Sequence, residues 1–200
     1  METFLSQTHF FGRVSDITVY TTKDKVKHYI YKIIDNFSRK VIGWCIADKV
    51  SAKIRVKTIK EAVKKVFGED ALNDLRLITD GGPENDNGIM KAFIKNANVN
   101  IEHQIALRDI VFSNSMIEAT YRVLKYSYLY DMEIANGKEL NSALKFYFDD
   151  YDNRPHYIHK YYSPNEVFYN NTPPINTKEL YKQAAENRIN TNKQRTCNNC

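Results

Sequence analysis

The order of apolar segments along this chain of 200 residues predicts an α/β fold, with a mixed β-sheet flanked by helices. Three runs rich in β-branched and aromatic residues come first, and short polar links join them. This pattern is typical of an antiparallel meander. Patterns of helix, strand, helix and strand then follow, so that five strands are expected in all.

The first three strands are expected at residues 13–20, 28–35 and 40–47. A helix should begin after Ser51, a suitable N-cap, and run to Phe67, because its apolar residues recur at helical spacing and Gly68 supplies a stop. The other expected elements are strands at 75–79 and 99–104, helices at about 88–97, 113–130, 138–150 and 177–187, and a short helix from Pro164 to Tyr169.

Composition restricts the class of protein. The chain is 42% hydrophobic and 26% charged, and it contains no apolar run of the roughly 18 residues that a membrane helix needs. Its first residues lack the pattern of a secretory signal, and three cysteines are too few for a disulfide framework. We therefore expect a globular, cytoplasmic protein that does not enter the membrane.

Net charge alone does not identify a ligand. The chain carries +5, but residues 173–200 hold five Lys or Arg against two Glu, which places +3 in this polar segment. A basic tail on a solvated surface explains this distribution as well as a nucleic-acid ligand does. Residues 173–200 are expected to form a partly disordered tail.

Three acidic residues stand where an acid is costly or functionally placed. Asp16 interrupts an apolar strand, Asp80 follows a buried strand at a glycine turn, and Glu118 lies in the first turns of a helix. Each also has a purely structural interpretation. Asp16 could face solvent at an edge, Asp80 could begin a turn, and Glu118 could be favoured by the helix dipole.

Several motifs occur together with these acids. They are SDIT at 15–18, IIDNFSRKVIGW at 33–44, LITDGGPEN at 77–85, SNSMIEA at 113–119 and YDNRPHYIHKYYSPNEVF at 151–168. In this order they resemble the integrase catalytic core of bacterial insertion-sequence transposases, to which retroviral integrases are more distantly related. The resemblance implies a ribonuclease H-like fold, with residues 1–172 as the catalytic core.

The resemblance also implies a catalytic triad of Asp16, Asp80 and Glu118 that binds two Mg²⁺ or Mn²⁺ ions. Carboxylates suit these cations, and two cations can assist an in-line displacement at phosphorus. The implied activity is that of a DDE-type polynucleotidyl transferase, which cleaves DNA at a 3′ end and transfers the strand. The alternatives are a non-catalytic DNA-binding remnant and a ribonuclease H-like nuclease without strand transfer. Gly81 and Asn85 depart from the family pattern, which often has Asn and an aromatic residue there.

Four further residues are expected to contact DNA. Arg122 and Lys125 share the helix face of Glu118, where an ordinary ion pair with Glu118 is the alternative. Arg154 and His156 belong to the NRPH motif and should order a loop near the site. The tyrosine-rich segment 121–130 could stack on bases, although apolar packing is the favoured interpretation.

Other polar groups are expected to have structural roles. Asp35 should hydrogen-bond in the turn before the third strand, and Asp149, Asp150 and Asp152 should form a solvated helix end. Zinc binding by Cys197 and Cys200 together with His156 and His159 is a weaker alternative, because a polar tail is a poor frame for such a site.

The expected partners are transposon ends and target DNA, with the chain acting as a homo-oligomer on DNA near the bacterial nucleoid. Only about ten residues precede the core, where the family usually has a helix-turn-helix region. The chain is therefore expected to be a truncated element, an excised domain, or the catalytic partner of a separate DNA-binding chain.

Overall fold

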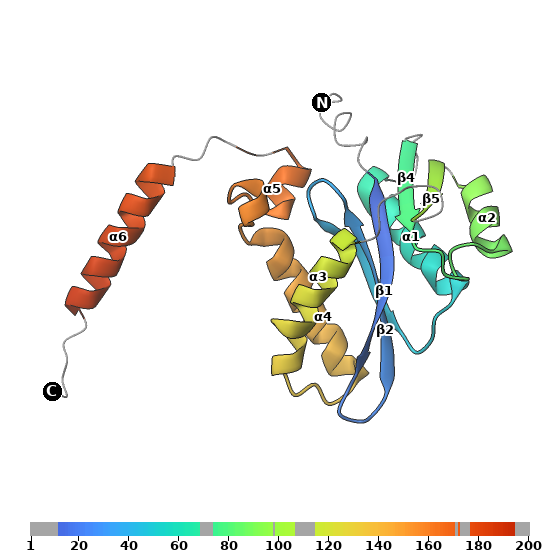
Figure 1. Ribbon diagram of the computed structural model, residues 1–200, viewed down its shortest axis with the longest axis horizontal. Helices are drawn as coiled ribbons and strands as arrows, with labels where there is room; N and C mark the ends of the chain where they lie inside the picture. The colour runs from blue at the N-terminus through green and yellow to red at the C-terminus, as the bar shows by residue number, and fades with distance from the viewer. Residues whose placement is uncertain are drawn as a thin grey trace.

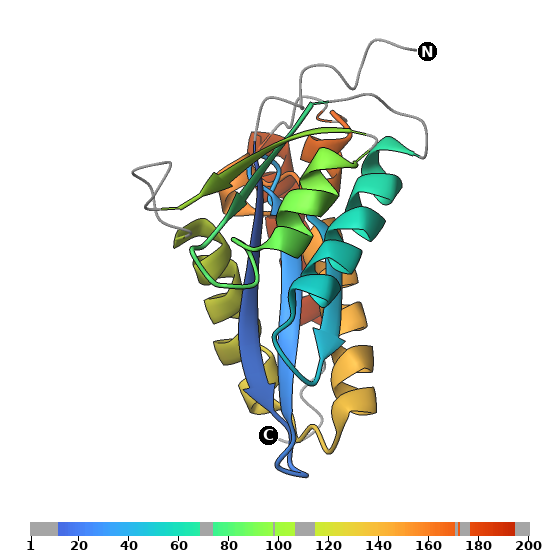
Figure 2. The same cartoon turned by 90° about the vertical axis from the view of Figure 1, so that its right-hand side faces the viewer.

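The computed structural model describes residues 12–68, 74–97, 99–106, 115–170, 172 and 177–194. Within them, five strands form one mixed sheet in the order β3-β2-β1-β4-β5, and helices cover both of its faces (Figure 1 and Figure 2). This confirms the predicted α/β fold with a five-stranded sheet.

The meander predicted at the start of the chain consists of β1 (Arg13–Thr21), β2 (Lys27–Asp35) and β3 (Val41–Ala47), which pair in antiparallel fashion. The strands β4 (Asp74–Thr79) and β5 (Asn100–Ile105) extend the sheet from β1 in parallel. Parallel pairing requires crossover connections, which the intervening helices provide.

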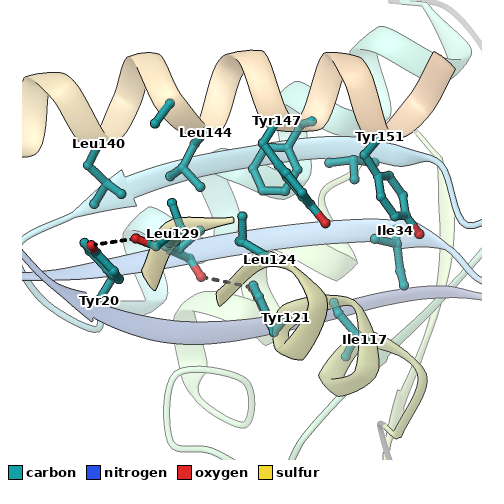
Figure 3. Packing of buried hydrophobic residues seen from close by; sticks show 14 of the residues in the cluster. Tyr20, Ile34, Ile117, Tyr121, Leu124, Leu129, Leu140, Leu144, Tyr147 and Tyr151 are labelled. Carbon is teal, nitrogen blue, oxygen red and sulfur yellow. Dashed lines mark hydrogen bonds between the residues drawn. The ribbon is translucent and has the colours of Figure 1, made fainter. Parts of the chain in front are cut away.

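Each face of the sheet has its own apolar cluster. On one face α1 (Ala52–Phe67) and α2 (Gly88–Lys95) pack over residues such as Ile33 and Leu77. On the other face α3 (Ser115–Tyr126) and α4 (Gly137–Asn153) form a cluster with β1 and β2, in which Leu124 and Leu144 are fully buried (Figure 3). The sheet is therefore buried on both sides, with α1 packed on one face and α3 on the other.

Glycine permits the close packing of α1. A Cβ atom at Gly43 on β3 would lie 2.8 Å from the Cβ of Ala62 on α1, so a larger residue would push the helix away from the sheet. The helix ends as predicted at Gly68, whose φ of 78° suits glycine. Ser51 holds the N-cap position, but its side chain makes no capping hydrogen bond.

The end of the long helix predicted at 113–130 differs from the prediction. The helix α3 ends at Tyr126, and a single turn of 3₁₀ helix, η2 (Leu129–Asp131), follows. Leu129 is fully buried in the same cluster as Leu124, so the apolar pattern continues across the break and conceals it in the sequence. Residues 113 and 114, at the predicted start, lie outside the described residues.

Beyond α4 the chain forms η3 (Tyr157–His159) and the short helix α5 (Pro164–Phe168), where Ser163 and Glu166 make a capping box. The helix α6 (Thr177–Gln194) continues past the predicted end at 187 and stands apart from the sheet and its helices (Figure 1). Across the described residues, no helix combines the length and the apolar character needed to cross a membrane.

Candidate active site

Strand register places Asp16 beside Asp80. The parallel pairing of β1 with β4 includes Ser15 opposite Thr79, and Asp16 and Asp80 are the next residues of their respective segments. Asp80 follows the last residue of β4, which is the end of a parallel strand where α/β folds commonly bind ligands. Two of the predicted acids therefore meet at one point of the sheet.

Glu118 approaches this point from the first turn of α3. Burial is the main cause that raises the pKa of Asp16, and the negative charges of Asp80 and Glu118 raise it further. The backbone N–H of Ile17, which donates to Asp16 Oδ1 at 2.7 Å, acts in the opposite direction. The structure thus brings the three predicted acids within electrostatic reach of one another.

Tyr121 fixes α3 to the strand that carries Asp16. Its ring is buried one turn after Glu118, and its hydroxyl lies 2.7 Å from the backbone oxygen of Asp16 and 3.0 Å from that of Ile30. Figure 3 shows this side chain between α3 and the sheet. The contact ties the position of Glu118 to β1 without using the Asp16 carboxylate.

Lys32 is a buried cation in the site that sequence reasoning missed. It lies opposite Asp16 in the β1–β2 register, donates to the hydroxyl of Thr120, and has its ammonium 3.8 Å from the centre of the Tyr121 ring. Burial lowers the pKa of Lys32 to about 7, although the charge of Asp16 raises it in part. The available signal was a lone cation inside the apolar strand HYIYKIID, the same signal that marks Asp16 in its own strand.

The Asp80 carboxylate is held by Asn85, a second residue that was not predicted to act here. The buried side chain amide of Asn85 donates to Asp80 Oδ1 and, at 3.3 Å, to the Asp80 backbone oxygen. The loop after β4 therefore closes on itself and fixes the Asp80 carboxylate through Asn85. This contact gives a physical role to one of the two departures from the family pattern.

Arg55 of α1 supports this loop from the opposite face of the sheet. Its guanidinium is fully buried, donates to the hydroxyl of Ser15, and lies 3.6 Å from a carboxylate oxygen of Glu84. The charge of Arg55 also lowers the pKa of Asp16. Because Glu84 is adjacent to Asn85, the ion pair connects α1 to the segment that holds Asp80.

The donor chemistry of the site suits a hard divalent cation. Asp16, Asp80 and Glu118 offer carboxylate oxygens, and a cation would relieve the mutual repulsion that raises the pKa of Asp16. Within the described ranges, however, no three acidic, His or Cys side chains converge into a group that could hold a metal ion. The three acids are neighbours in an open arrangement.

Arg122 and Lys125 follow Glu118 on α3 (Ser115–Tyr126). Arg122 is exposed and Lys125 is half-buried, which lowers the pKa of Lys125. In the part of the chain that the structure describes, neither of them forms an ion pair with Glu118, so the alternative of an ordinary helix pair is not supported. Both cations follow Glu118 along the helix.

Arg154 and His156 lie at the end of α4, where they contact this helix. The Arg154 guanidinium lies 3.5 Å from Asp150 and near the rings of Tyr147 and Tyr151, while His156 Nε2 lies 3.0 Å from the Tyr151 backbone oxygen. Neither of them is among the groups that shift the pKa of Asp16. The predicted contacts with DNA stay predictions.

The zinc alternative finds no support. Cys197 and Cys200 lie outside the described residues. A ring nitrogen of His159 lies 2.9 Å from the Ser38 backbone oxygen, and His156 is engaged with Tyr151 as described above.

Asp35 has the structural role that was predicted for it. Its carboxylate accepts hydrogen bonds from the backbone N–H and the hydroxyl of Ser38, both at 2.7 Å, and forms a buried ion pair with Arg13 at 2.7 Å. The prediction of a solvated helix end is correct for Asp149 and Asp150, which are exposed.

For Asp152 the same prediction is wrong. This residue is buried, lies 3.3 Å from the Lys40 ammonium, and accepts a hydrogen bond from the Val41 backbone N–H at 2.8 Å. It therefore connects the end of α4 to the start of β3.

Comparisons with known proteins extend these observations. Residues 13–107 match the family model of the integrase core domain. The chain is similar to the HTLV-2 integrase catalytic core domain in complex with magnesium, with 18% identity, a TM-score of 0.61, and coverage of 79% of this chain and 95% of that chain. A comparison with curated proteins found no match.

Two further solved structures are similar at lower identity. One is a chain of the simian T-cell lymphotropic virus intasome in complex with PP2A regulatory subunit B56 gamma, with 16% identity and a TM-score of 0.62. The alignment covers 82% of this chain but only 55% of the viral chain. The other is the catalytic domain of the Mos1 mariner transposase, with 12% identity, a TM-score of 0.55, and 72% coverage of each chain.

Proposed function

We propose that the chain is the metal-dependent catalytic core of a DDE-type DNA transposase, because residues 13–107 match the family model of the integrase core domain and the chain has the ribonuclease H-like fold of integrase and transposase cores. The reaction is cleavage at a DNA 3′ end followed by strand transfer. Each step is an in-line displacement at phosphorus, first by water and then by the freed 3′ hydroxyl.

Asp16 carries this proposal. It is a half-buried acid in the middle of a strand, where burial raises its pKa, and Asp80 and Glu118, which reach it from a loop and a helix, raise it further. An arrangement of three repelling carboxylates has no benefit for folding. It does serve to bind cations at a phosphodiester.

Asp16, Asp80 and Glu118 would hold Mg²⁺ or Mn²⁺ through carboxylate oxygens, and a pair of these ions would stabilise charge on the attacking and leaving oxygens. The protein supplies the orientation. Asn85 holds the Asp80 carboxylate, and the Tyr121 hydroxyl attaches α3 to β1. Arg122 and Lys125 would bind phosphates of the DNA strand beside the acids.

We also propose that the chain acts as a homo-oligomer on transposon ends and target DNA, in the nucleoid of a bacterial cell. A helix-turn-helix domain, on this protein or on a separate chain, would recognise the ends. Without it, the chain should bind duplex DNA with little sequence preference, because phosphate contacts position a protein without reading bases.

The test is to incubate the chain with labelled duplex DNA and Mg²⁺ or Mn²⁺, and to separate nicked from joined products. Asp16→Asn should abolish both products and leave the fold intact, whereas the exposed Asp149→Asn serves as a matched control with full activity. Nicked products alone would identify a nuclease. DNA binding without any product would identify a non-catalytic remnant.

Metal binding can be measured separately from activity. Millimolar Mg²⁺ should raise the melting temperature of the wild type, because a ligand that binds the native state stabilises it. The same addition should have a smaller effect on Asp16→Asn. A melting temperature that does not respond to either metal would contradict a metal site formed by these acids.

A further inference from the structure

Two tyrosines near the end of α3 are exposed, although their neighbours in the sequence pack into the core. Tyr121 is 5% exposed, whereas Tyr126 is 68% exposed and Tyr130 is 54% exposed. Their rings meet edge to face with centres 5.1 Å apart. Apolar packing, the interpretation favoured from the sequence for segment 121–130, therefore does not explain this pair.

The Tyr126–Tyr130 pair packs on a buried residue of β1. The ring of Tyr130 stacks on the buried ring of Tyr20, with centres 6.1 Å apart and an angle of 24° between the planes. The Tyr20 hydroxyl in turn donates to the Leu129 backbone oxygen at 3.2 Å, as Figure 3 shows. Because Tyr130 packs on a buried ring, its side chain is already ordered. A ligand that stacks on the pair would therefore cost little side-chain entropy on binding.

The charges around the pair indicate the chemistry of its ligand. Arg122 lies one helical turn before Tyr126, so a positive charge and an exposed aromatic ring share one face of α3, and Lys125 follows Arg122 by three residues. Cations beside exposed rings are the combination that binds the phosphates and bases of unpaired nucleic acid. Asp131 and Glu133 follow the pair in the sequence, and Glu133 forms an ion pair with Lys23 at 2.6 Å.

The size of the patch argues against a stable protein interface. A tyrosine buries at most about 250 Å², whereas a specific protein interface buries about 1,200–2,000 Å² in total. The two rings, even together with the 43% exposed Val123 one turn before Tyr126, provide too little apolar area for such an interface. They provide enough for one or two bases.

We propose that the Tyr126–Tyr130 pair stacks on unpaired bases of the DNA strand whose phosphates lie along Arg122 and Lys125. This inference rests on the proposed function, because it takes the reacting phosphate to lie at Glu118 and its neighbouring acids. Tyr126 follows Glu118 by about 12 Å along the helix axis, which corresponds to about three or four stacked nucleotides. The pair therefore binds a single-stranded segment next to the reacting end.

The test compares a blunt duplex with a duplex that carries a short single-stranded extension containing 2-aminopurine. The wild type should bind the extended duplex more tightly and quench the 2-aminopurine fluorescence. Tyr126→Ala should lose roughly 5- to 150-fold in affinity for the extended duplex, the equivalent of one lost base stack, and should bind the blunt duplex normally. Tyr126→Phe should behave as the wild type, and Tyr126→Leu should behave as the alanine variant.

Tyr157 and Tyr161 offer a matched control, because they form a similar edge-to-face pair, 6.0 Å apart, in the segment that follows α4. Tyr157→Ala should bind both duplexes as the wild type does. Equal affinity of the wild type for the two duplexes, or of wild type and Tyr126→Ala for the extended one, would overturn the inference. So would a change of oligomeric state in Tyr126→Ala, which would show that the pair contacts protein. If the wild type bound no duplex at all, the proposed function itself would fail.

Discussion

Asp16 and Lys32 lie opposite each other on β1 and β2, and burial acts on their pKa values in opposite directions. It raises the pKa of Asp16 and lowers that of Lys32 to about 7, because loss of hydration disfavours the charged form of each group. The charge of Asp16 offsets part of the effect on Lys32. The site therefore keeps two ionisable groups in the sheet at a cost in folding free energy.

Lys32 predicts a pH dependence of stability. In the unfolded chain Lys32 keeps its proton up to about pH 10, whereas in the folded chain it loses the proton near pH 7, so the unfolded state binds more protons between these values. The free energy of unfolding should therefore rise from pH 7 to about 9, by about 2 kcal/mol from this group.

Urea denaturation at several pH values measures this rise, and Lys32→Met provides the comparison. The variant keeps an unbranched apolar side chain but cannot bind the proton, so its stability should lack this increase. A parallel rise in the wild type and in Lys32→Met would show that another group is responsible.

Arg55 and Glu84 form an ion pair in which the loss of one residue leaves the other buried without a counter-charge. Arg55→Met should lower the free energy of unfolding by about 3 kcal/mol or more, because it leaves the largely buried Glu84 without a cation. Nε and Nη2 of Arg55 find no hydrogen-bond partner among the described residues, so Arg55 itself is costly to bury. Arg55→Met combined with Glu84→Gln should therefore recover part of the loss in chemical denaturation.

The same variants test whether the pair positions Asp80. Arg55→Met should require more Mg²⁺ or Mn²⁺ for half-maximal stabilisation, because the loop that holds the Asp80 carboxylate loses its anchor on α1. An Arg55→Met variant that is destabilised but responds to metal as the wild type does would limit the pair to folding.

At the level of secondary structure, the helix α3 packs one face against the sheet and exposes charged side chains on the other. Ile117, Tyr121 and Leu124 are buried against the sheet, while Glu118 and Arg122 point outward from the same turns. Because side chains recur on each face of a helix with a fixed period, one segment can bury apolar residues on one face and expose charged residues on the other. Mutations on the outer side should therefore change DNA binding with little effect on stability.

Arg122→Ala and Lys125→Ala should each weaken duplex binding about equally for all sequences and lower the slope of log K against log salt by about 1. The melting temperature of Arg122→Ala should hardly change, because an exposed charge contributes at most about 1 kcal/mol, whereas Lys125→Ala also removes a half-buried side-chain stem and should lower it slightly. Lys57→Ala, on the exposed side of α1 and beyond the other face of the sheet, is the control that should keep the wild-type slope. An unchanged slope together with a large loss of stability would assign Arg122 or Lys125 to packing.

Local patterns predicted most elements of this fold, because each strand and helix carries its own periodicity and end signals. The meander, the helix that Gly68 ends and the strand before Asp80 all lie within a few residues of their predicted bounds. The break after Tyr126 was missed, because Leu129 continues the apolar pattern across it. By contrast, no local sequence pattern predicts which residues of separate strands pair with each other in the sheet.

Register explains why part of the site was not predicted. The three acids could be selected because each is unusual in its own segment. Lys32 is also unusual in its own strand, but its place beside Asp16 is known only once β2 is paired with β1. The role of Arg55 is known only once α1 is packed against Ser15. Asp152 was misjudged for the same reason, since Lys40 and Val41 reach it from a distant strand.

At the scale of the whole molecule, the described chain divides into a packed body and a separate polar helix. The sheet with its two helical layers buries both apolar clusters, whereas the side chains described on α6 are mostly exposed. The Tyr161 and Tyr181 hydroxyls, 3.3 Å apart, link α6 to the body. Residues 173–200 also carry +3 of the net charge, from five Lys or Arg and two Glu.

Removal of residues 173–200 should therefore lower the affinity for DNA without changing the stability of the fold. The shortened chain should unfold at the same urea concentration as the full chain, because an exposed hydrogen bond contributes at most about 1.5 kcal/mol. Tyr161→Phe in the full chain measures that contribution by itself. Duplex affinity at low salt should fall, and the salt slope should decrease, because basic side chains are lost. A clearly lower midpoint for the shortened chain would show that the folded domain extends beyond residue 172, because the tail would then bury surface that unfolding exposes.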